Sequence, residues 1–278
     1  QVEASVLSLY DKERLTGPLK AGAEIDWETL DREVTAKLAQ AGQIRIVSNS
    51  VLSPTTKKAV GEFIAKYPGA KHVSYDAVSA YGISEANRRS FGEVMIPSYD
   101  FSKAKTIVSV GADFLGTWIS PIEFAKQYAQ TRKIHAEHRE MSRHYQFESN
   151  LSLTGANADY RTPIKPSQVG PLVAAMYNAV AAKAGAAKVN APAVGDVSYM
   201  AKAANELWAN RGKSLVVAGS NDPAVQVLVN GINAMLGNYG VTLSTERPVH
   251  FRQGNDQDLA NFAKELNAGT VKAVIFFN

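Results

Sequence analysis

The chain has 278 residues, of which 45% are hydrophobic and 20% charged, and its formal net charge is +4. This composition is typical of a globular protein and excludes a disordered chain. The sequence contains no cysteine, which excludes disulfides, thiolate zinc sites and cysteine-bound iron–sulfur clusters within these residues. No apolar stretch approaches the roughly 20 residues of a membrane-spanning helix, and early charges interrupt any signal-peptide core. We therefore expect no direct membrane insertion and no visible export signal.

The mild positive charge does not indicate a nucleic-acid-binding protein. The densest basic run, Arg132 to His144, also contains Glu137 and Glu140. A solvated helix face explains such mixed charge better than a track for phosphates does. We therefore expect no nucleic-acid partner.

The first predicted elements alternate between short β-branched runs and longer amphipathic runs. Residues 44–48 (IRIVS) are typical of a buried strand. Ser53 and Pro54 then begin a helix that runs to about residue 66, because serine is a favoured N-cap and proline a favoured first helical residue. A second strand is expected at 71–75, followed by a helix at 82–91.

The middle of the chain contains the clearest strand, 106–111 (TIVSVG), an apolar run long enough to be buried on both faces of a parallel sheet. Ser120 and Pro121 begin the next helix, which we expect to run through Arg139. Residues 144–149 are then predicted to form a strand. The polar, turn-rich segment 151–169 is longer than a plain connection requires.

A helix predicted at 168–184 leads into residues 184–196, which are rich in Ala, Gly and Pro and form the best candidate linker. Strands and helices alternate again after the linker. The remaining helices are expected at 197–210, 223–236 and 256–266, and the remaining strands at 214–219, 241–243 and 271–277.

This alternation predicts right-handed crossovers and parallel sheets with helices on both faces. We expect an α/β protein of two lobes, each a mostly parallel, doubly wound, Rossmann-like sheet. The predicted organisation is an N-terminal extension at 1–40, a first lobe at 41–188 and a second lobe at 196–278 that is truncated at its last strand. Because the sequence stops at the carboxyl end of a strand, where a loop should begin, we expect a fragment of a longer protein.

Ligands of such folds bind at the carboxyl ends of the strands. The candidate loops are therefore 48–50, 111–113, 219–221 and the residues after Asn278. No Walker loop and no G-x-G-x-x-G follows a strand, which argues against standard nucleotide sites. Gly111 and Gly116 flank a short turn, where they either let the backbone approach a phosphate or simply allow a tight connection.

A histidine cluster is the one candidate for a metal site. His135 and His138 share one face of the predicted helix, and His144 is near in sequence. No third ligand stands at a recognisable zinc spacing, and the neighbouring basic residues repel a cation. A surface helix is the better interpretation. The sequence also lacks paired catalytic carboxylates, a nucleophile elbow and a thiol nucleophile.

Two segments resemble a known family: VGADFLGTW at 110–118 and ESNLSLTGANADYRTPIKP at 148–166. Their order resembles that in molybdopterin oxidoreductases of the dimethyl sulfoxide reductase type. The opening at 4–18 is most similar to the large iron–sulfur subunit of alternative complex III, a quinol-oxidising respiratory assembly. The resemblance implies that six residues occupy cofactor-binding positions: Gly111, Asp113, Glu148, Asp159, Gly219 and Asn278.

The chain also departs from the family pattern. A strand end at 147–149 reads Phe-Glu-Ser where the family has Asp-Pro-Arg, and 166–169 lacks the family's acidic residue. The family's metal ligand has no clear counterpart, since only Asp76 and Ser79 are available near its place. Each lost charge-assisted contact removes about 1.5–3 kcal/mol. The resemblance therefore implies the family's scaffold with a degenerate cofactor pocket.

The resemblance implies a fragment of a redox subunit on the periplasmic side of the membrane, with a scaffold and docking role and no activity alone. Its partners would be other subunits or domains of a respiratory complex. The family uses molybdopterin guanine dinucleotide and iron–sulfur clusters, but we expect no cofactor in this fragment. Two alternatives stay open: an active molybdopterin-guanine-dinucleotide oxidoreductase acting on a small oxide-type substrate, and a nucleotide-binding module that uses 111–116.

Overall fold

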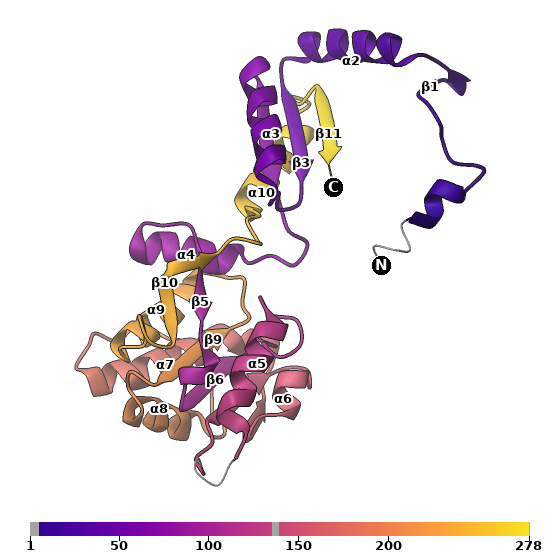
Figure 1. Cartoon of the computed structure of the whole chain (residues 1–278). Helices are drawn as coiled ribbons and strands as arrows, with labels where there is room; N and C mark the ends of the chain where they lie inside the picture. The colour runs from indigo at the N-terminus through magenta and orange to yellow at the C-terminus, as the bar shows by residue number, and fades with distance from the viewer. Residues whose placement is uncertain (1–5, 135–138, 278) are drawn as a thin grey trace. The chain divides into compact units, whose positions relative to one another are not determined.

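The computed structural model describes residues 6–134 and 139–277 (Figure 1). The chain divides into two compact units. Unit 1 consists of residues 1–74 and 257–278, and unit 2 consists of residues 75–256. Each unit contains a parallel sheet flanked by helices, so the predicted α/β class is confirmed.

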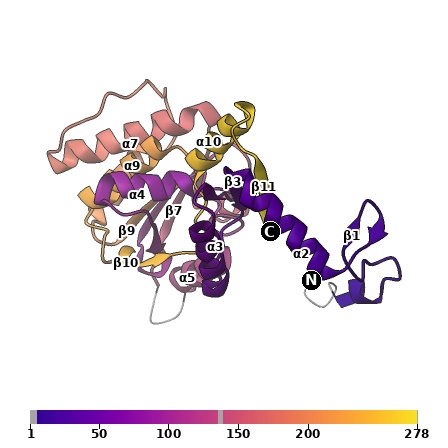
Figure 2. The same cartoon turned by 90° about the horizontal axis from the view of Figure 1, so that it is seen from above.

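Unit 1 contains a three-stranded parallel sheet in the order β11-β3-β4. Helices α3 and α10 lie on opposite sides of it (Figure 2). Val47 and Val73 pack against Phe262 of α10, and buried Arg45 pairs with Glu265 at 2.7 Å. The elements are η1 (Val6–Tyr10), β1 (Leu19–Lys20), β2 (Ala23–Glu24), α2 (Trp27–Ala41), β3 (Ile44–Ser48), α3 (Pro54–Lys66), β4 (Ala70–Ser74), α10 (Asp256–Asn267) and β11 (Ala273–Phe277).

The start of α3 follows the sequence prediction. Ser53 is its N-cap, and the Ser53 hydroxyl accepts a hydrogen bond from the Thr56 N–H at 3.3 Å. We expect Ser53→Ala to lower the free energy of unfolding of unit 1 by about 1 kcal/mol, because that N–H then lacks its partner. Denaturant unfolding measures the loss. Ser53→Asp keeps a capping oxygen and should stay close to the wild type; an equal loss in both variants would contradict the capping role.

Unit 2 is built on a four-stranded, fully parallel sheet in the order β8-β7-β6-β9. A separate antiparallel ribbon pairs β5 with β10. The elements are α4 (Tyr81–Phe91), β5 (Ile96–Tyr99), η2 (Phe101–Lys103), β6 (Thr106–Val110), α5 (Pro121–Arg132), β7 (Arg143–Glu148), α6 (Leu153–Ala156), β8 (Tyr160–Pro163), η3 (Pro166–Gln168), α7 (Val169–Ala184), α8 (Met200–Ala209), β9 (Ser214–Ala218), α9 (Pro223–Met235) and β10 (Leu243–Val249).

Strands β6 and β9 of this sheet carry buried apolar side chains on both faces, as the run at 106–111 predicted. Val108 and Val216 face one core with α7, α8 and α9. Ile107 and Leu215, which alternate with them along the strands, face a second core with α4, α5 and the aromatic side chain of Phe101. Alternate residues of one strand therefore serve two cores, which fixes the orientation of the strand ends that form the site.

The units differ from the predicted lobes of residues 41–188 and 196–278. Strand β9 pairs with β6, and β11 pairs with β3. The irregular segment at 185–196, predicted as the linker, therefore lies inside unit 2. Strand pairing over long sequence distances decides these boundaries, and composition alone does not report it.

Two element predictions are wrong in detail. Helix α5 ends at Arg132 rather than Arg139; His135 and His138, the zinc candidates, lie outside the described residues. The strand expected at 241–243 is instead β10, and its antiparallel partner β5 was not predicted. A four-residue strand that contains proline gives a weak local signal. Among the described residues, no helix has the length and apolarity needed to cross a bilayer.

Candidate functional site

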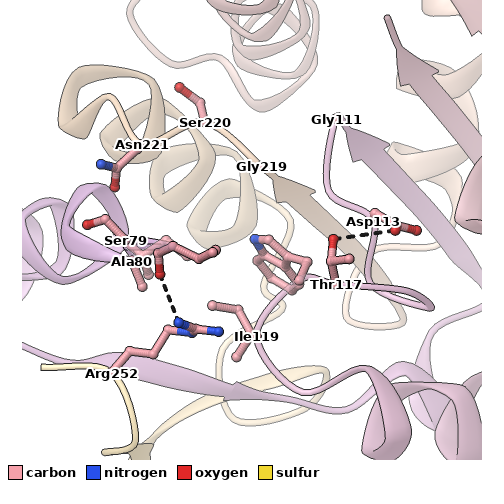
Figure 3. A pocket seen from close by; sticks show the side chains of 13 residues that line it. Ser79, Ala80, Gly111, Asp113, Thr117, Ile119, Gly219, Ser220, Asn221 and Arg252 are labelled. Atoms are coloured by element: carbon pink, nitrogen blue, oxygen red, sulfur yellow. Dashed lines mark hydrogen bonds between the residues drawn. The ribbon is translucent and has the colours of Figure 1, made fainter. Parts of the chain in front are cut away.

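The candidate site is a groove at the carboxyl edge of the sheet of unit 2. It consists of two adjoining cavities of about 410 and 180 Å³. The larger cavity lies over the ends of β6 and β7. The smaller one, drawn in Figure 3, extends toward α4. Four residues line both: Gly111, Asp113, Gly219 and Ser220. Three of the six predicted positions thus lie together there, and Glu148 lines the larger cavity.

Two glycines allow the strand ends to approach each other. Gly111 has φ +70°, a left-handed conformation that other residues rarely adopt. A Cβ on Gly219 would lie 2.2 Å from the Gly111 carbonyl oxygen. Because that obstacle is backbone, a side chain at 219 would force the two strand ends apart.

We expect Gly219→Ala to lower the free energy of unfolding of unit 2 by about 2 kcal/mol, within the range for an overpacked site. Denaturant unfolding followed by tryptophan fluorescence measures it. Gly170→Ala is the matched control, because a Cβ there meets only the Val225 side chain at 3.6 Å. That helical glycine should tolerate alanine or gain stability. Equal losses in the two variants would show that the close approach at 219 is unimportant.

The side chain and the backbone carbonyl of Asp113 both accept hydrogen bonds from other residues of the protein. Its Oδ1 accepts hydrogen bonds from the Thr154 N–H at 3.1 Å and the Thr154 hydroxyl at 2.7 Å. Its backbone oxygen accepts from the N–H groups of Gly116, Thr117 and Trp118 at 2.9–3.1 Å. These bonds tie the loop after β6 to α6.

The turn at 111–116 is therefore a tight connection. A phosphate cradle needs free backbone N–H groups. The N–H groups of residues 116–118 are taken by the Asp113 carbonyl, and the Leu115 N–H donates to the Thr154 hydroxyl at 2.9 Å. Gly116 is needed because a Cβ there would lie 2.1 Å from Oδ2 of Asp113. The donors of residues 115–118 are thus occupied within the protein, and a phosphate would meet only N–H groups from the first half of the turn.

Glu148 is also occupied, and it is only 4% exposed. Its carboxylate accepts from the Arg161 Nε at 2.6 Å and from the Ser152 hydroxyl and N–H at 2.6 and 3.2 Å. Burial by itself raises the pKa of Glu148, but the hydrogen bonds from Ser152, Arg161 and Gln146 outweigh it, so the net pKa is below its ordinary value. Gly155 leaves room for this carboxylate.

Asp159 is not part of the groove. It precedes β8, at the amino edge of the sheet, where it pairs with Arg132 at 2.7 Å and accepts from the His144 N–H at 2.8 Å. In a parallel sheet, the residue before a strand and the residue after it lie at opposite edges. Asp159, which the resemblance implies as a cofactor-binding position, therefore lies at the opposite edge of the sheet from Asp113 and Glu148. Asn278, the sixth predicted position, lies outside the described residues.

A row of buried polar side chains along one face of β7 runs from the amino edge of the sheet to its carboxyl edge. His144 is fully buried, and its ring contacts the Tyr128 hydroxyl at 3.2 Å and the Gln146 Oε1 at 3.3 Å. The Gln146 amide donates to Glu148 at 3.1 Å. Burial lowers the pKa of His144 to about 4. The Gln146 Oε1 can only accept, so the single N–H of the neutral ring lies on Nε2 and donates to Gln146.

The smaller cavity has a wall that the sequence did not identify. Asn221 accepts from the Gly82 N–H at 2.8 Å and donates to Asp256 at 2.7 Å, and Ser79 donates to Asp256 at 2.8 Å. Arg252 lies across the cavity, and its guanidinium donates to the Val78 carbonyl at 2.9 Å (Figure 3). Only Asn221 was in a predicted loop; Arg252 follows β10, whose pairing was not predicted.

The remaining predicted candidates make hydrogen bonds within their own units, and one of them, Ser79, lines the smaller cavity. Loop 48–50 belongs to unit 1, where the Ser48 hydroxyl contacts the His72 Nε2 at 2.7 Å. Of the two stand-ins for the family's metal ligand, Asp76 accepts from the Gly254 N–H and Ser79 donates to Asp256. Within residues 6–134 and 139–277, no group of three or more ligating side chains is arranged to hold a metal ion.

No family model matches the chain, and no curated protein matches it. Solved structures do. Acetylene hydratase from Pelobacter acetylenicus matches with a TM-score of 0.55 and 10% identity, over 87% of this chain and 38% of that one. The formyltransferase/hydrolase complex of Methylorubrum extorquens with methylofuran matches with a TM-score of 0.60 and 14% identity, over 93% and 75%. The chain thus shares their fold and spans under two fifths of the acetylene hydratase chain.

Proposed function

We propose that this chain is part of a redox subunit of the molybdopterin-oxidoreductase type, closest to the large subunit of alternative complex III, in a quinol-oxidising respiratory complex. In this proposal its cofactor pocket is degenerate, and it serves as a scaffold that docks other subunits or domains on the periplasmic side. Support comes from the two segments that carry the resemblance, 110–118 and 148–166. They form adjoining loops of one groove at the carboxyl edge of the sheet.

One observation carries the degenerate pocket: both carboxylates of the groove already accept hydrogen bonds from neighbouring residues. The Oδ1 of Asp113 accepts from Thr154 and its Oδ2 accepts a longer bond from the Thr117 hydroxyl at 3.4 Å, and the Glu148 carboxylate accepts from Arg161 and Ser152. Neither can turn toward a guanine base without losing its present bonds. Two carboxylates also repel a pyrophosphate, and Arg161 is already paired. The described residues therefore do not fit molybdopterin guanine dinucleotide, and no reaction step is assigned to it.

Metal and pterin analysis of the full-length protein, purified from its native membrane, tests the proposal. Iron, molybdenum and tungsten are measured by mass spectrometry, and pterin by its fluorescence after oxidation. We expect stoichiometric iron, from clusters held elsewhere in the protein, with molybdenum and tungsten far below one per chain. Stoichiometric molybdenum or tungsten with pterin would overturn the degenerate pocket, and absence of iron would overturn the redox role.

The size of the groove favours a second candidate, an active molybdopterin-guanine-dinucleotide oxidoreductase that acts on a small oxide-type substrate. The larger cavity, of about 410 Å³, is in the range of small-molecule sites. This candidate predicts reduction of an S- or N-oxide by full-length protein made with cofactor biosynthesis intact. Filling the cavity with Ser149→Trp should then abolish turnover without unfolding the protein, whereas the scaffold role predicts no turnover in either protein.

A further inference from the structure

A third cavity of unit 2 lies outside the groove. It has a volume of about 440 Å³ and is enclosed by α4, the entry to β5 and the segment after β10. Its apolar side is formed by Met95 and Ile96, which are 6% and 1% exposed, together with Val249. Val94, 72% exposed, stands at its rim. The cavity thus offers an apolar surface that is open to a ligand.

The α4 side of this cavity carries a fixed pair of guanidinium groups. Both Arg88 and Arg89 bind the carboxylate of Glu85: Arg88 through two bonds of 2.7 Å and Arg89 through one of 2.9 Å. Hydrogen bonds from Arg88, and then from Arg89, lower the pKa of Glu85 to about 2. The Glu85 carboxylate therefore orients two guanidinium groups, and the three side chains together keep a net positive charge.

Of these two arginines, Arg88 lines the cavity and retains donors that can reach a ligand. The side chain of Glu85 is 11% exposed, whereas those of Arg88 and Arg89 are 52% and 49% exposed. A guanidinium has five N–H donors. Among the described residues, Glu85 takes two from Arg88 and one from Arg89. Arg88 lines the cavity, so its unused donors stand beside the apolar surface.

The opposite side of the cavity adds a further cation, Arg252, which lines both this cavity and the groove. Two acidic residues lie near it but do not line this cavity. Asp76 accepts from the Gly254 N–H, and Asp256 accepts from Ser79 and Asn221. The ionised side chains that line the cavity are therefore Glu85, which is already bonded, and two arginines.

We propose that this cavity binds a small organic carboxylate with an aromatic or branched aliphatic body. The carboxylate would bond the free N–H groups of Arg88, since a guanidinium matches the planar geometry of a carboxylate. The body would cover Met95, Ile96 and Val249. The volume suits a ligand of this class. An inorganic phosphate has the charge but no apolar part, so it would leave that surface exposed to water.

Isothermal titration calorimetry tests the proposal with three probes: 3-phenylpropionate, its neutral analogue 3-phenylpropionamide, and inorganic phosphate. We expect saturable binding of the carboxylate, with the amide at least about tenfold weaker because it lacks the charge, and phosphate at least about tenfold weaker because it lacks the apolar body. Equal affinity for the carboxylate and the amide would overturn the proposal, as would the absence of saturable binding.

Variants locate the binding. Arg88→Gln should weaken 3-phenylpropionate about tenfold, whereas Lys126→Gln, which removes the same charge from an exposed position on α5, should leave affinity unchanged. At the rim, Val94→Asp should weaken binding and Val94→Lys should not. Far-UV circular dichroism verifies that each variant folds. Equal effects of Arg88→Gln and Lys126→Gln, or of the two Val94 substitutions, would show that the carboxylate does not bind here.

Discussion

Arg161→Met is expected to lower the free energy of unfolding of unit 2 by about 3 kcal/mol at pH 7. The Glu148 side chain is 5% exposed and the Arg161 side chain 26%, and their N–O distance is 2.6 Å. Removing Arg161 leaves a buried carboxylate with only its neutral donors, Ser152 and Gln146. The expected loss in the free energy of unfolding is at the lower end of the range for breaking a buried ion pair, because Arg161 is partly exposed. Denaturant unfolding at pH 7 measures it.

Two comparisons separate this effect from a general loss of charge. Lys58→Met breaks an exposed pair with Glu62, 3.8 Å apart, and should change stability by less than about 0.5 kcal/mol. The loss in Arg161→Met should also shrink below about pH 4.5, the ordinary pKa of glutamate. In the wild type, the lowered pKa of Glu148 stabilises the fold above that pH and the contribution is lost on acidification. A loss that does not depend on pH would contradict the ion-pair explanation.

Acidification from pH 6.5 to pH 4 is expected to remove about 3 kcal/mol of the stability of unit 2 through His144 alone. Burial lowers the pKa of His144 to about 4 from an ordinary value of 6.5. Between these values the unfolded chain binds a proton that the folded protein does not. Stability therefore falls as the pH falls through this range, and it is fully retained above it. Unfolding curves at several pH values between 7 and 5 measure the slope.

His144→Gln is the informative variant, because glutamine bonds its neighbours but does not titrate. It should be less stable than the wild type at pH 7, and its stability should vary less between pH 7 and 5. This range lies above the ordinary pKa values of Glu148 and Asp159, so those carboxylates contribute little to the slope. An unchanged slope in the variant would show that His144 titrates normally in the folded protein.

The sequence predicts those parts of the fold that local signals determine. Ser53-Pro54 and Ser120-Pro121 mark the starts of α3 and α5, and the apolar runs at 44–48 and 106–110 are buried strands. Each of these segments carries its own cap or its own apolar pattern. The loops after β6 and β9 were also predicted as candidate binding loops, although their strands were assigned to different lobes and in fact pair with each other.

The rest depends on partners that are distant in sequence. Asp159 was assigned to the groove by resemblance, but it lies before its strand and pairs with Arg132. Arg252 reaches the smaller cavity because β10 pairs with β5, about 150 residues earlier in the chain. The bonds that occupy Asp113 and Glu148 require side chains of α6 and β8. The hydrophobic periodicity and the motif spacing of the sequence do not predict such contacts.

The division of the chain sets an order for folding during synthesis. Unit 2 is inserted between the two halves of unit 1, so its residues, 75–256, leave the ribosome as one continuous block. Strand β3 gains its neighbour β11 only when residues 273–277 have been made. The sheet of unit 1 can therefore be completed only after the whole of unit 2 has been made.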